Sequence, residues 1–264
     1  MNYTTFISSI TQKYGSSPMF LKVLKENQEH YGLTYKLGIN EDSLTFNPTG
    51  SCESGGLYFS INEYITKFCD LGTKIAIIKL MDDALFYIEP NDDKFKTNKF
   101  IIEKIYTFQE FYTEYQKIAI IGIKYNNEIL QYVKEQTEEL CKLAVQQNGD
   151  VLKYVKVQTD ELCKLAVQKN GLALQYVNKQ TNELCKLAVQ QNGHALEYVK
   201  EQTDELCKLA VQQNGFALQF VKEQTEELCK LAVQQNGLAL YYVKKQTDEL
   251  CKLAVQHDGF ALRM

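Results

Sequence analysis

The sequence has little of what metal and redox sites need. It contains three histidines, His30, His194 and His257, which do not recur in step with the cysteines, and it contains no CxxC pair. Because such sites depend on regular Cys and His spacings, we expect no metal site and no cofactor. Within the repeated part of the chain, Thr, Glu, Lys and Cys recur only because the unit recurs, so we expect no catalytic residue there.

An excess of positive charge is also missing. The chain carries 29 basic and 33 acidic residues, which gives a net charge of −4 at pH 7. Lys and Glu alternate along the second half of the chain and do not gather on one face. Because nucleic-acid binding depends on clustered basic residues that neutralise phosphates, we expect no nucleic-acid partner.

Long apolar runs and a signal peptide are missing as well. No segment approaches the roughly 18 apolar residues that a membrane span needs. The first residues, MNYTTFISSITQKYG, have neither a basic start nor a continuous apolar run. We therefore expect no membrane partner and a protein kept in the reducing cytosol. Hydrophobic residues at 45% and charged residues at 23% indicate a folded chain.

What the sequence does have is a repeat of 22 residues. Residues 137–158 read TEELCKLAVQQNGDVLKYVKVQ and begin again almost letter for letter at Thr159. A fixed period of this length predicts a stacked repeat array. Residues 115–136 align as a degenerate first copy, and the last copy is truncated, so residues 115–264 hold about seven units. One cysteine occupies the same position in six copies: Cys141, Cys163, Cys185, Cys207, Cys229 and Cys251.

One unit, residues 159–180, indicates two short helices. Thr159 suits an N-cap, and the acidic residues after it complement the helix dipole. The apolar residues that follow cover an arc of about 200°, so the helix must be buried on two sides. We expect Gly171 to end this helix in the left-handed conformation and a second helix to follow. The two antiparallel helices, about 11 and 8 residues long, would depend on stacking because isolated helices this short are marginal in water.

A leucine-rich repeat is the competing interpretation. The spacing Leu-x-x-Leu-x-Val-x-x-Asn over residues 140–148 matches the start of such a unit. The position that a leucine-rich repeat would bury next is occupied by Asp150 and His194 in two of the copies, and either residue would be costly inside a core. The remaining KEQTEE segment favours helix. The predicted fold is an α+β N-terminal domain, residues 1–114, followed by an all-α solenoid with two helices per repeat. A leucine-rich-repeat-like solenoid is the alternative.

Residues 1–114 lack the period and predict a compact α+β domain. Residues 4–14 predict a helix closed by Gly15, and Phe20–Lys25 fits either a strand or part of a helix over residues 19–29. Ser60 and Glu63 predict a capping box for a helix that stops at Gly72. Strand-like runs lie at residues 32–40, 56–61, 74–80, 84–89 and 100–108, with a loop over 47–56 and a hairpin or turn over 81–83.

The repeated cysteines are expected to be packing residues. Equivalent helices of neighbouring units lie about 8–10 Å apart, whereas a disulfide needs Cα atoms within about 7 Å. We therefore expect a row of free, half-buried thiols that act as small apolar side chains. A metal or redox array is the alternative.

Two positions vary while the rest of the unit stays almost constant, and a variable stripe on a constant scaffold predicts a recognition surface. The alternative for the first position is that its side chain packs on the last helical turn, as Leu172 would on Val167. Relaxed packing in recent copies would also produce variation. The first position, directly after each glycine, holds Asp150, Leu172, His194, Phe216, Leu238 and Phe260. The second, three residues further on, holds Lys153, Gln175, Glu197, Gln219 and Tyr241.

A second candidate lies in the N-terminal domain. Residues 55–60, GGLYFS, lead into the predicted helix, with His30 and Tyr31 upstream and Glu103 downstream. This arrangement resembles the His, Tyr and Glu pattern of ADP-ribosyltransferases. The resemblance implies a strand that supports nicotinamide and an acid that acts on the ribose. The alternative places Tyr58 and Phe59 in the core and edge of a strand and His30 at a surface turn.

The repeat core LCKLAVQQNGxALxYVKxQT resembles the tandem repeats of mimivirus-like giant DNA viruses of amoebae, and similar units occur in some bacterial proteins. The run HYGLTYKLGINEDSLTFNPTGSCESGGLYFS is similar to a leader domain that precedes repeat arrays, including ankyrin arrays, in those viruses. The resemblance implies a leader domain followed by interchangeable repeats that bind partners, with no established activity to carry over.

We therefore expect a non-enzymatic scaffold that binds a protein partner, in the host cytoplasm if the chain is viral. The first alternative is an ADP-ribosyltransferase-like enzyme in the N-terminal domain, with the repeats as a targeting arm. The second is a self-associating structural component, for which the virion is the expected location.

Overall fold

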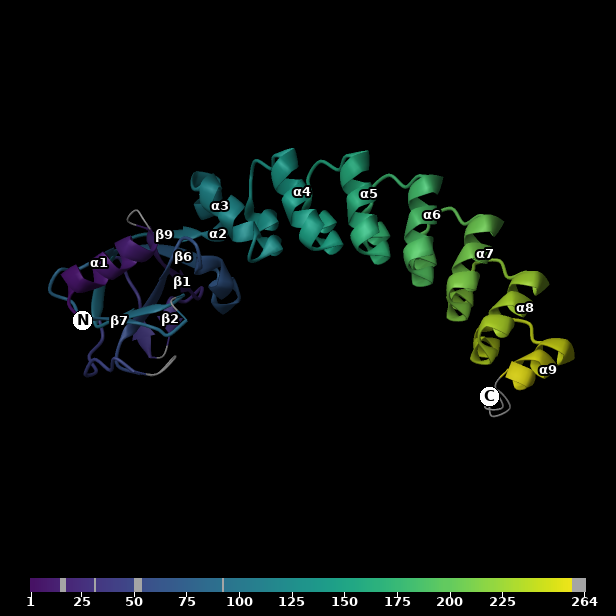
Figure 1. Ribbon diagram of the computed structural model, residues 1–264, viewed down its shortest axis with the longest axis horizontal. Helices are drawn as coiled ribbons and strands as arrows, with labels where there is room; N and C mark the ends of the chain where they lie inside the picture. Colours follow the sequence, from purple (N-terminus) through teal and green to yellow (C-terminus); the bar gives the residue numbers. More distant parts are fainter. Residues whose placement is uncertain (15–17, 31, 50–53, 92, 258–264) are drawn as a thin grey trace. The chain divides into compact units, whose positions relative to one another are not determined.

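The computed structural model describes residues 1–14, 18–30, 32–49, 54–91 and 93–257. The chain divides into two compact units, residues 1–136 and residues 137–264. The first unit contains an antiparallel sheet with helices, and the second is a run of repeated helices (Figure 1). Predicted residues Gly15, Tyr31 and Phe260 lie outside the described ranges.

The N-terminal unit is built on a seven-stranded sheet with the strand order β4-β9-β6-β1-β5-β8-β7, in which every pair is antiparallel. A separate two-stranded sheet joins β2 and β3. The strands are β1 (Phe20–Leu24), β2 (Glu29–His30), β3 (Leu33–Thr34), β4 (Gly38–Glu41), β5 (Leu57–Ile61), β6 (Lys74–Leu80), β7 (Phe86–Ile88), β8 (Phe95–Thr97) and β9 (Lys99–Thr107).

Helix α1 (Tyr3–Tyr14) packs on this sheet through Phe6, which is fully buried. The Phe6 ring stacks on Phe86 with centroids 4.7 Å apart and meets Phe95 edge-on at 5.5 Å. Such aromatic pairs contribute about 0.5–1.5 kcal/mol each beyond their area burial. The predicted helix at residues 4–14 is therefore confirmed, and aromatic side chains hold it on the sheet.

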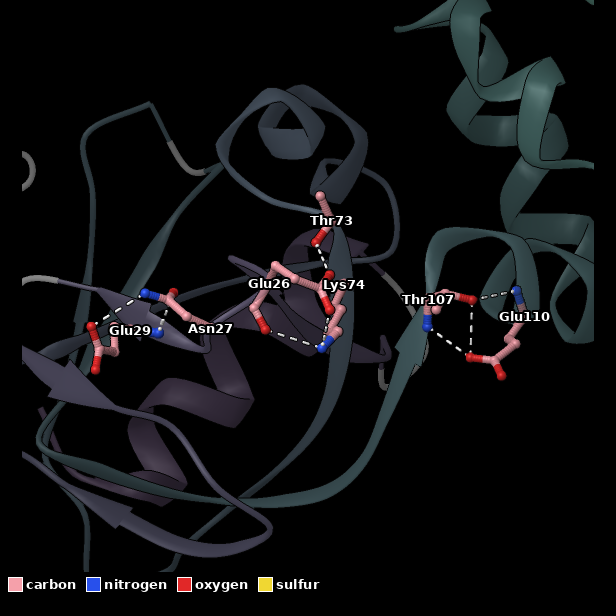
Figure 2. Close-up of polar contacts among 7 residues, drawn as sticks. All are labelled: Glu26, Asn27, Glu29, Thr73, Lys74, Thr107 and Glu110. Atoms are coloured by element: carbon pink, nitrogen blue, oxygen red, sulfur yellow. Dashed lines mark hydrogen bonds and ion pairs between the residues drawn. The ribbon is translucent and has the colours of Figure 1, made fainter.

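Four further helices complete the unit: the 3-10 helix η1 (Ile65–Leu71), α2 (Phe108–Glu114), α3 (Gln116–Ile123) and the 3-10 helix η2 (Asn127–Tyr132). A capping box begins α2, because the Thr107 hydroxyl accepts from the Glu110 amide and the Glu110 carboxylate accepts from the Thr107 amide (Figure 2). Figure 2 also shows Lys74 paired with the Glu26 carboxylate at 2.8 Å, beside the start of β6.

The capping box predicted at Ser60 was wrong. Ser60 does not cap a helix, because it lies in β5 and its hydroxyl donates to the Asp93 backbone oxygen. The helix that follows is a 3-10 helix whose N-cap, Tyr64, makes no side-chain cap. Of the two alternatives for residues 81–83, the structure has a turn between strands and not a hairpin, since β6 pairs with β1 and β9 while β7 pairs with β8. Of the strand and the helix predicted as alternatives at Phe20–Lys25, the structure has a strand, Phe20–Leu24.

Residues 115–136, the degenerate copy, have an α-helix followed by a 3-10 helix, as the later copies do. By contacts they group with the N-terminal unit. Gly122 of α3 packs so closely on η1 that an added Cβ would lie 2.6 Å from Thr66 Cγ2.

In the second unit each complete described copy forms a ten-residue α-helix and a six-residue 3-10 helix. Each α-helix packs on the next, and each 3-10 helix packs on the next 3-10 helix. The α-helices are α4 (Glu138–Gln147), α5 (Asp160–Lys169), α6 (Asn182–Gln191), α7 (Asp204–Gln213), α8 (Glu226–Gln235) and α9 (Asp248–His257). The 3-10 helices are η3 (Gly149–Tyr154), η4 (Gly171–Tyr176), η5 (Gly193–Tyr198), η6 (Gly215–Phe220) and η7 (Gly237–Tyr242).

The predicted N-cap is confirmed, because the Thr159 hydroxyl accepts from the Leu162 amide. The predicted role of Gly171 was wrong. The α-helix ends at Asn170, in extended backbone with φ −149° and ψ 112°, and the Asn170 side chain caps the 3-10 helix by accepting from the Leu172 amide. Gly171 does not have a positive φ. An added Cβ would lie 2.6 Å from the Ala188 carbonyl oxygen of the next copy, so the position needs Gly for close packing.

The leucine-rich alternative does not match this unit. Residues 138–147, where a leucine-rich repeat would need a strand, form α4. The second element is a 3-10 helix of six residues, and it is shorter than predicted because Val155, directly after it, already has the extended ψ of 119°. The chain therefore has a sheet-containing N-terminal region followed by a run of repeated helices.

Candidate functional site

Side-chain hydrogen bonds between neighbouring copies recur along the helical run. Gln202 illustrates the most regular set. Its Nε2 donates to the Phe220 carbonyl of the next copy at 2.8 Å, and its Oε1 accepts from the Lys222 amide at 3.0 Å. Gln158, Gln180 and Gln224 make the same two bonds to their following copies. We call Gln158, Gln180, Gln202 and Gln224 the glutamine ladder.

Each ladder glutamine also joins its own copy. Gln202 Nε2 lies 3.3 Å from the Leu196 oxygen, and the Cys207 thiol lies 3.7 Å from Gln202 Oε1. A primary amide offers two donors and two acceptor positions. The side chain therefore satisfies backbone groups of two consecutive copies and fixes the spacing between them.

The repeated cysteines form no disulfide and pack as small apolar side chains, as predicted, although most are more deeply buried than expected. Cys141, Cys163, Cys185, Cys207 and Cys229 are buried, and Cys251 is half-buried. Burial raises the pKa of Cys163 and its equivalents, so the thiolate is disfavoured. Among the described residues, no group of three or more His, Cys, Asp or Glu is placed to hold a metal ion.

The residues directly after each glycine are half-buried between copies. We call Asp150, Leu172, His194, Phe216 and Leu238 the post-glycine row. The His194 ring meets the Phe220 ring of the next copy edge-on at 5.6 Å, and Phe216 meets Tyr242 in the same way at 5.9 Å. Asp150 Oδ1 accepts from Asn170 Nδ2 at 2.9 Å. This row therefore takes part in the contact between copies, and much of its surface is used there.

The residues three positions further on are exposed. We call Lys153, Gln175, Glu197, Gln219 and Tyr241 the exposed row. Tyr241 leaves 68% of its surface accessible although its ring meets Tyr242 edge-on at 5.2 Å. Gln175 and Gln219 fold back on the carbonyls of Leu172 and Phe216 at 3.1 Å. The two predicted positions therefore differ in the structure: the post-glycine row lies between copies, and the exposed row faces solvent.

A third variable position was missed in the sequence. It lies just before each ladder glutamine and before the equivalent Gln246, and it holds Val157, Lys179, Glu201, Glu223 and Lys245, all exposed. Val157 is 76% accessible, which is unusual for an apolar side chain in a stacked array. We call these residues the second exposed row. Their variation between copies was visible in the sequence, but their neighbours in the polar KEQT segment concealed it.

Ion pairs link neighbouring copies beside these rows. Lys186 Nζ lies 2.6 Å from Glu205 Oε1, and Lys208 Nζ lies 2.7 Å from Glu227 Oε1. The carboxylates are largely exposed, and pairs of this kind contribute about 0–1 kcal/mol. They therefore add little to the stability of the array.

The residues of the predicted ADP-ribosyltransferase pattern are divided between two places. His30 and Tyr58 line one hollow, together with Phe59 and Ser60. Glu103 is exposed on β9 and lines a different one with Lys104 and Glu110. Tyr31 lies outside the described residues. The fold therefore places His30 and Tyr58 in one hollow and Glu103 in a different one.

Comparisons with known proteins show what the repeats and the chain are similar to. Residues 160–204, 183–225 and 203–248 each match the domain of unknown function DUF4116. Two ankyrin repeat proteins of Acanthamoeba polyphaga mimivirus are similar to part of this chain. One is 28% identical over 33% of this chain and 31% of its own length, and the other is 25% identical over 36% of this chain and 50% of its own length.

The aligned part thus spans a third to a half of those relatives. No solved structure matches the chain. Within the described residues, no helix has both the length and the apolar character to cross a bilayer. The resemblance predicted from the repeat core is confirmed: the chain is similar to mimivirus repeat proteins, and its repeats match DUF4116 three times in overlapping windows.

Proposed function

We propose that the helical run is a scaffold that binds a protein partner through its two exposed rows. The observation that carries the proposal is the distribution of variation in the array. Core and contact positions such as Leu206, Cys207 and the ladder glutamines are the same in every complete copy. The two exposed rows change from copy to copy. Constant packing with variable exposed side chains is how repeat proteins present a binding surface.

The chemistry of the exposed rows suits a protein surface. Each copy presents a different pair: Lys153 with Val157, Glu197 with Glu201, and, at the far end of the described copies, Tyr241 with Lys245. Tyr is enriched at the centres of protein interfaces because it combines a large apolar ring with a polar end. The mimivirus relatives are described as ankyrin repeat proteins, which supports an interaction scaffold and favours a partner from the host cell.

The test compares a double substitution in the exposed row, Glu197→Lys with Tyr241→Ser, with a matched control in the same copies. The control, Gln190→Ser with Gln234→Ser, changes exposed residues at a position that is constant between copies. Full-length chains would be used to capture partners from cells that naturally express the protein, and the affinity of a purified partner would then be measured.

We expect the exposed-row variant to lose at least about tenfold in affinity, equivalent to about 1.4 kcal/mol. The control should bind as the wild type does, and all three chains should melt at the same temperature. Equal losses in both variants would contradict the assignment of the surface. Concentration-dependent self-association without a captured partner would favour the structural alternative.

A further inference from the structure

The N-terminal sheet covers one of its edges and leaves part of the other open. At β7, the Met1 amine donates to the Phe86 oxygen at 2.8 Å, and the Phe86 amide donates to the Met1 oxygen at 2.9 Å. At the opposite edge, β4 pairs only with residues 99–102 of β9. Among the described residues, 103–107 of β9 pair with β6 on one side and with no strand on the other. An open strand edge of this kind is a template for a further strand.

The edge is open because the chain turns away from β9 at the start of β4. Gly38, the first residue of β4, has a φ of 90°. The Asn40 side chain fixes this turn, because it accepts from the Lys36 amide at 2.9 Å and donates to the Lys36 oxygen at 2.7 Å and to the Gly38 oxygen at 2.9 Å. The segment before Gly38 therefore does not continue β4 along β9.

A groove of about 680 Å³ lies along the open edge. Gln28, Lys36 and Leu37 line it on one side, and residues 103–107 of β9 line it on the other. Its volume is in the range of about 300–1,000 Å³ that is usual for binding sites. Five strand residues span about 17 Å, so the groove is long enough for a short extended peptide. Leu37 leaves 63% of its surface accessible and provides an apolar contact.

The backbone of Ile105 faces this groove. At the end of β9 the Thr107 amide donates to the Glu110 carboxylate at 2.8 Å and not to β6 (Figure 2). In an antiparallel strand, residues two apart turn their N–H and C=O groups to the same side. Ile105 therefore directs both groups to the open edge, whereas Lys104 and Tyr106 direct theirs to β6. One donor and one acceptor are thus available to an added strand.

Two charges of opposite sign also lie at the groove. Lys36 and Glu103 are exposed, and neither belongs to an ion pair among the described residues. The other lysines of the groove are paired with carboxylates. The groove therefore suits a segment in which an apolar side chain is accompanied by one acidic and one basic side chain.

We propose that this groove binds an extended segment of a partner protein, which adds a strand to β9 beyond the end of β4. The backbone of the segment pairs with the N–H and C=O of Ile105. Its apolar side chain lies on Leu37, and its acidic and basic side chains reach Lys36 and Glu103. The groove belongs to the N-terminal unit, and this binding is independent of the exposed rows of the repeats.

The test is a parallel selection of random linear peptides, displayed on phage, on three full-length chains: wild type, Leu37→Ser and Ile39→Ser. Ile39 is the matched control, because it is also apolar and exposed but lies on β4 outside the groove. We expect one class of peptides, with an apolar residue accompanied by both charges, to be enriched on wild type and Ile39→Ser but not on Leu37→Ser. Calorimetry with a synthetic peptide of this class should give an affinity at least about tenfold lower for Leu37→Ser.

Two further measurements use the wild-type chain and test the backbone pairing itself. N-methylation of one alternate set of peptide amides should weaken binding at least about tenfold, whereas methylation of the other set should be tolerated. In amide exchange followed by NMR, the bound peptide should slow exchange at Ile105 and change it little at Lys104 and Tyr106. The proposal would be overturned if no peptide class distinguished wild type from Leu37→Ser, if Ile39→Ser lost the same peptides, if both methylated forms bound equally, or if Ile105 exchange stayed unchanged.

Discussion

Replacing Gln202 with alanine tests whether the glutamine ladder fixes the spacing of the copies. The substitution removes the bond to the Phe220 carbonyl at 2.8 Å and the bond from the Lys222 amide at 3.0 Å, both of which join consecutive copies. It also removes the longer bond to the Leu196 oxygen at 3.3 Å. No large apolar side chain is lost, so the change isolates the polar contacts.

The magnitude follows from these contacts. A hydrogen bond contributes about 0.5–1.5 kcal/mol net, and leaving a partly buried backbone group without its partner costs about 1–3 kcal/mol. Two good bonds between copies therefore predict a loss of about 2–3 kcal/mol. Because stability in a repeat array is a sum of unit and nearest-neighbour terms, the loss should be local to α6, α7 and the 3-10 helices beside them.

Hydrogen exchange followed by mass spectrometry is the appropriate assay, since a chain with two compact units need not unfold in one transition. Exchange in α6 and α7 should accelerate about 30- to 150-fold, because each 1.4 kcal/mol corresponds to a factor of ten. Gln212→Ala, at an exposed position of α7, serves as the control.

Equal exchange in Gln202→Ala and Gln212→Ala would refute a role of the glutamine ladder in the spacing of the copies. The Gln202 side chain would then be a bystander, and the apolar contacts alone would set the spacing.

Three further predictions concern packing and charge. Gly193→Ala should destabilise the array by about 1–3 kcal/mol, because its Cβ would lie 2.7 Å from the Ala210 oxygen; an unchanged melting temperature would contradict the close approach. Phe216→Ser should lower the melting temperature whereas Gln219→Ser should not, since Phe216 meets Tyr242 between copies; equal melting of the two variants would argue against that contact.

The third prediction of this group is a pH dependence. Burial lowers the pKa of Lys22 in the folded chain to about 7 from its ordinary value of 10.5, so the unfolded chain holds this proton over a range in which the folded chain has lost it. Stability should therefore rise with pH above 7, by at most about 1.4 kcal/mol per pH unit. The difference between wild type and Lys22→Met in the protection of β1 and β6, measured between pH 7 and 8.5, isolates this group; a constant difference would contradict the burial of a charged lysine.

The α-helix of each copy could be predicted from the sequence because its determinants are local. Thr159 caps the first turn, and the apolar arc after it is buried as expected. The second element could not be predicted in the same way. Its start is fixed by the Asn170 side-chain cap and by the packing of Gly171 on the next copy, and the latter contact exists only once copies are stacked.

The sheet shows the same limit. Most strand segments were recognisable, but their order was not, because β6 pairs with β1 and β9, and β7 pairs with β8, and none of these partners follows from the local sequence. Ser60 had the spacing of a cap, yet tertiary pairing with Leu21 placed it in a strand. Local residue preferences predict secondary structure poorly where burial and long-range strand pairing determine it.

For the candidate site, the sequence showed which positions vary between copies but not which of them are exposed. His194 and Phe216 looked as available as Glu197 and Gln219, and only the contacts between copies distinguish them. The glutamine ladder was missed for the opposite reason. A constant glutamine in a polar segment reads as a surface residue, although its amide joins the backbones of two copies.

The most direct test of the scaffold account is hydrogen exchange of the full chain with and without a captured protein partner. The account predicts that binding slows exchange in segments that carry the exposed rows and recur every 22 residues, namely residues 153–157, 175–179, 197–201, 219–223 and 241–245. Protection confined to the N-terminal unit, or to the constant outer faces of the α-helices, would contradict it.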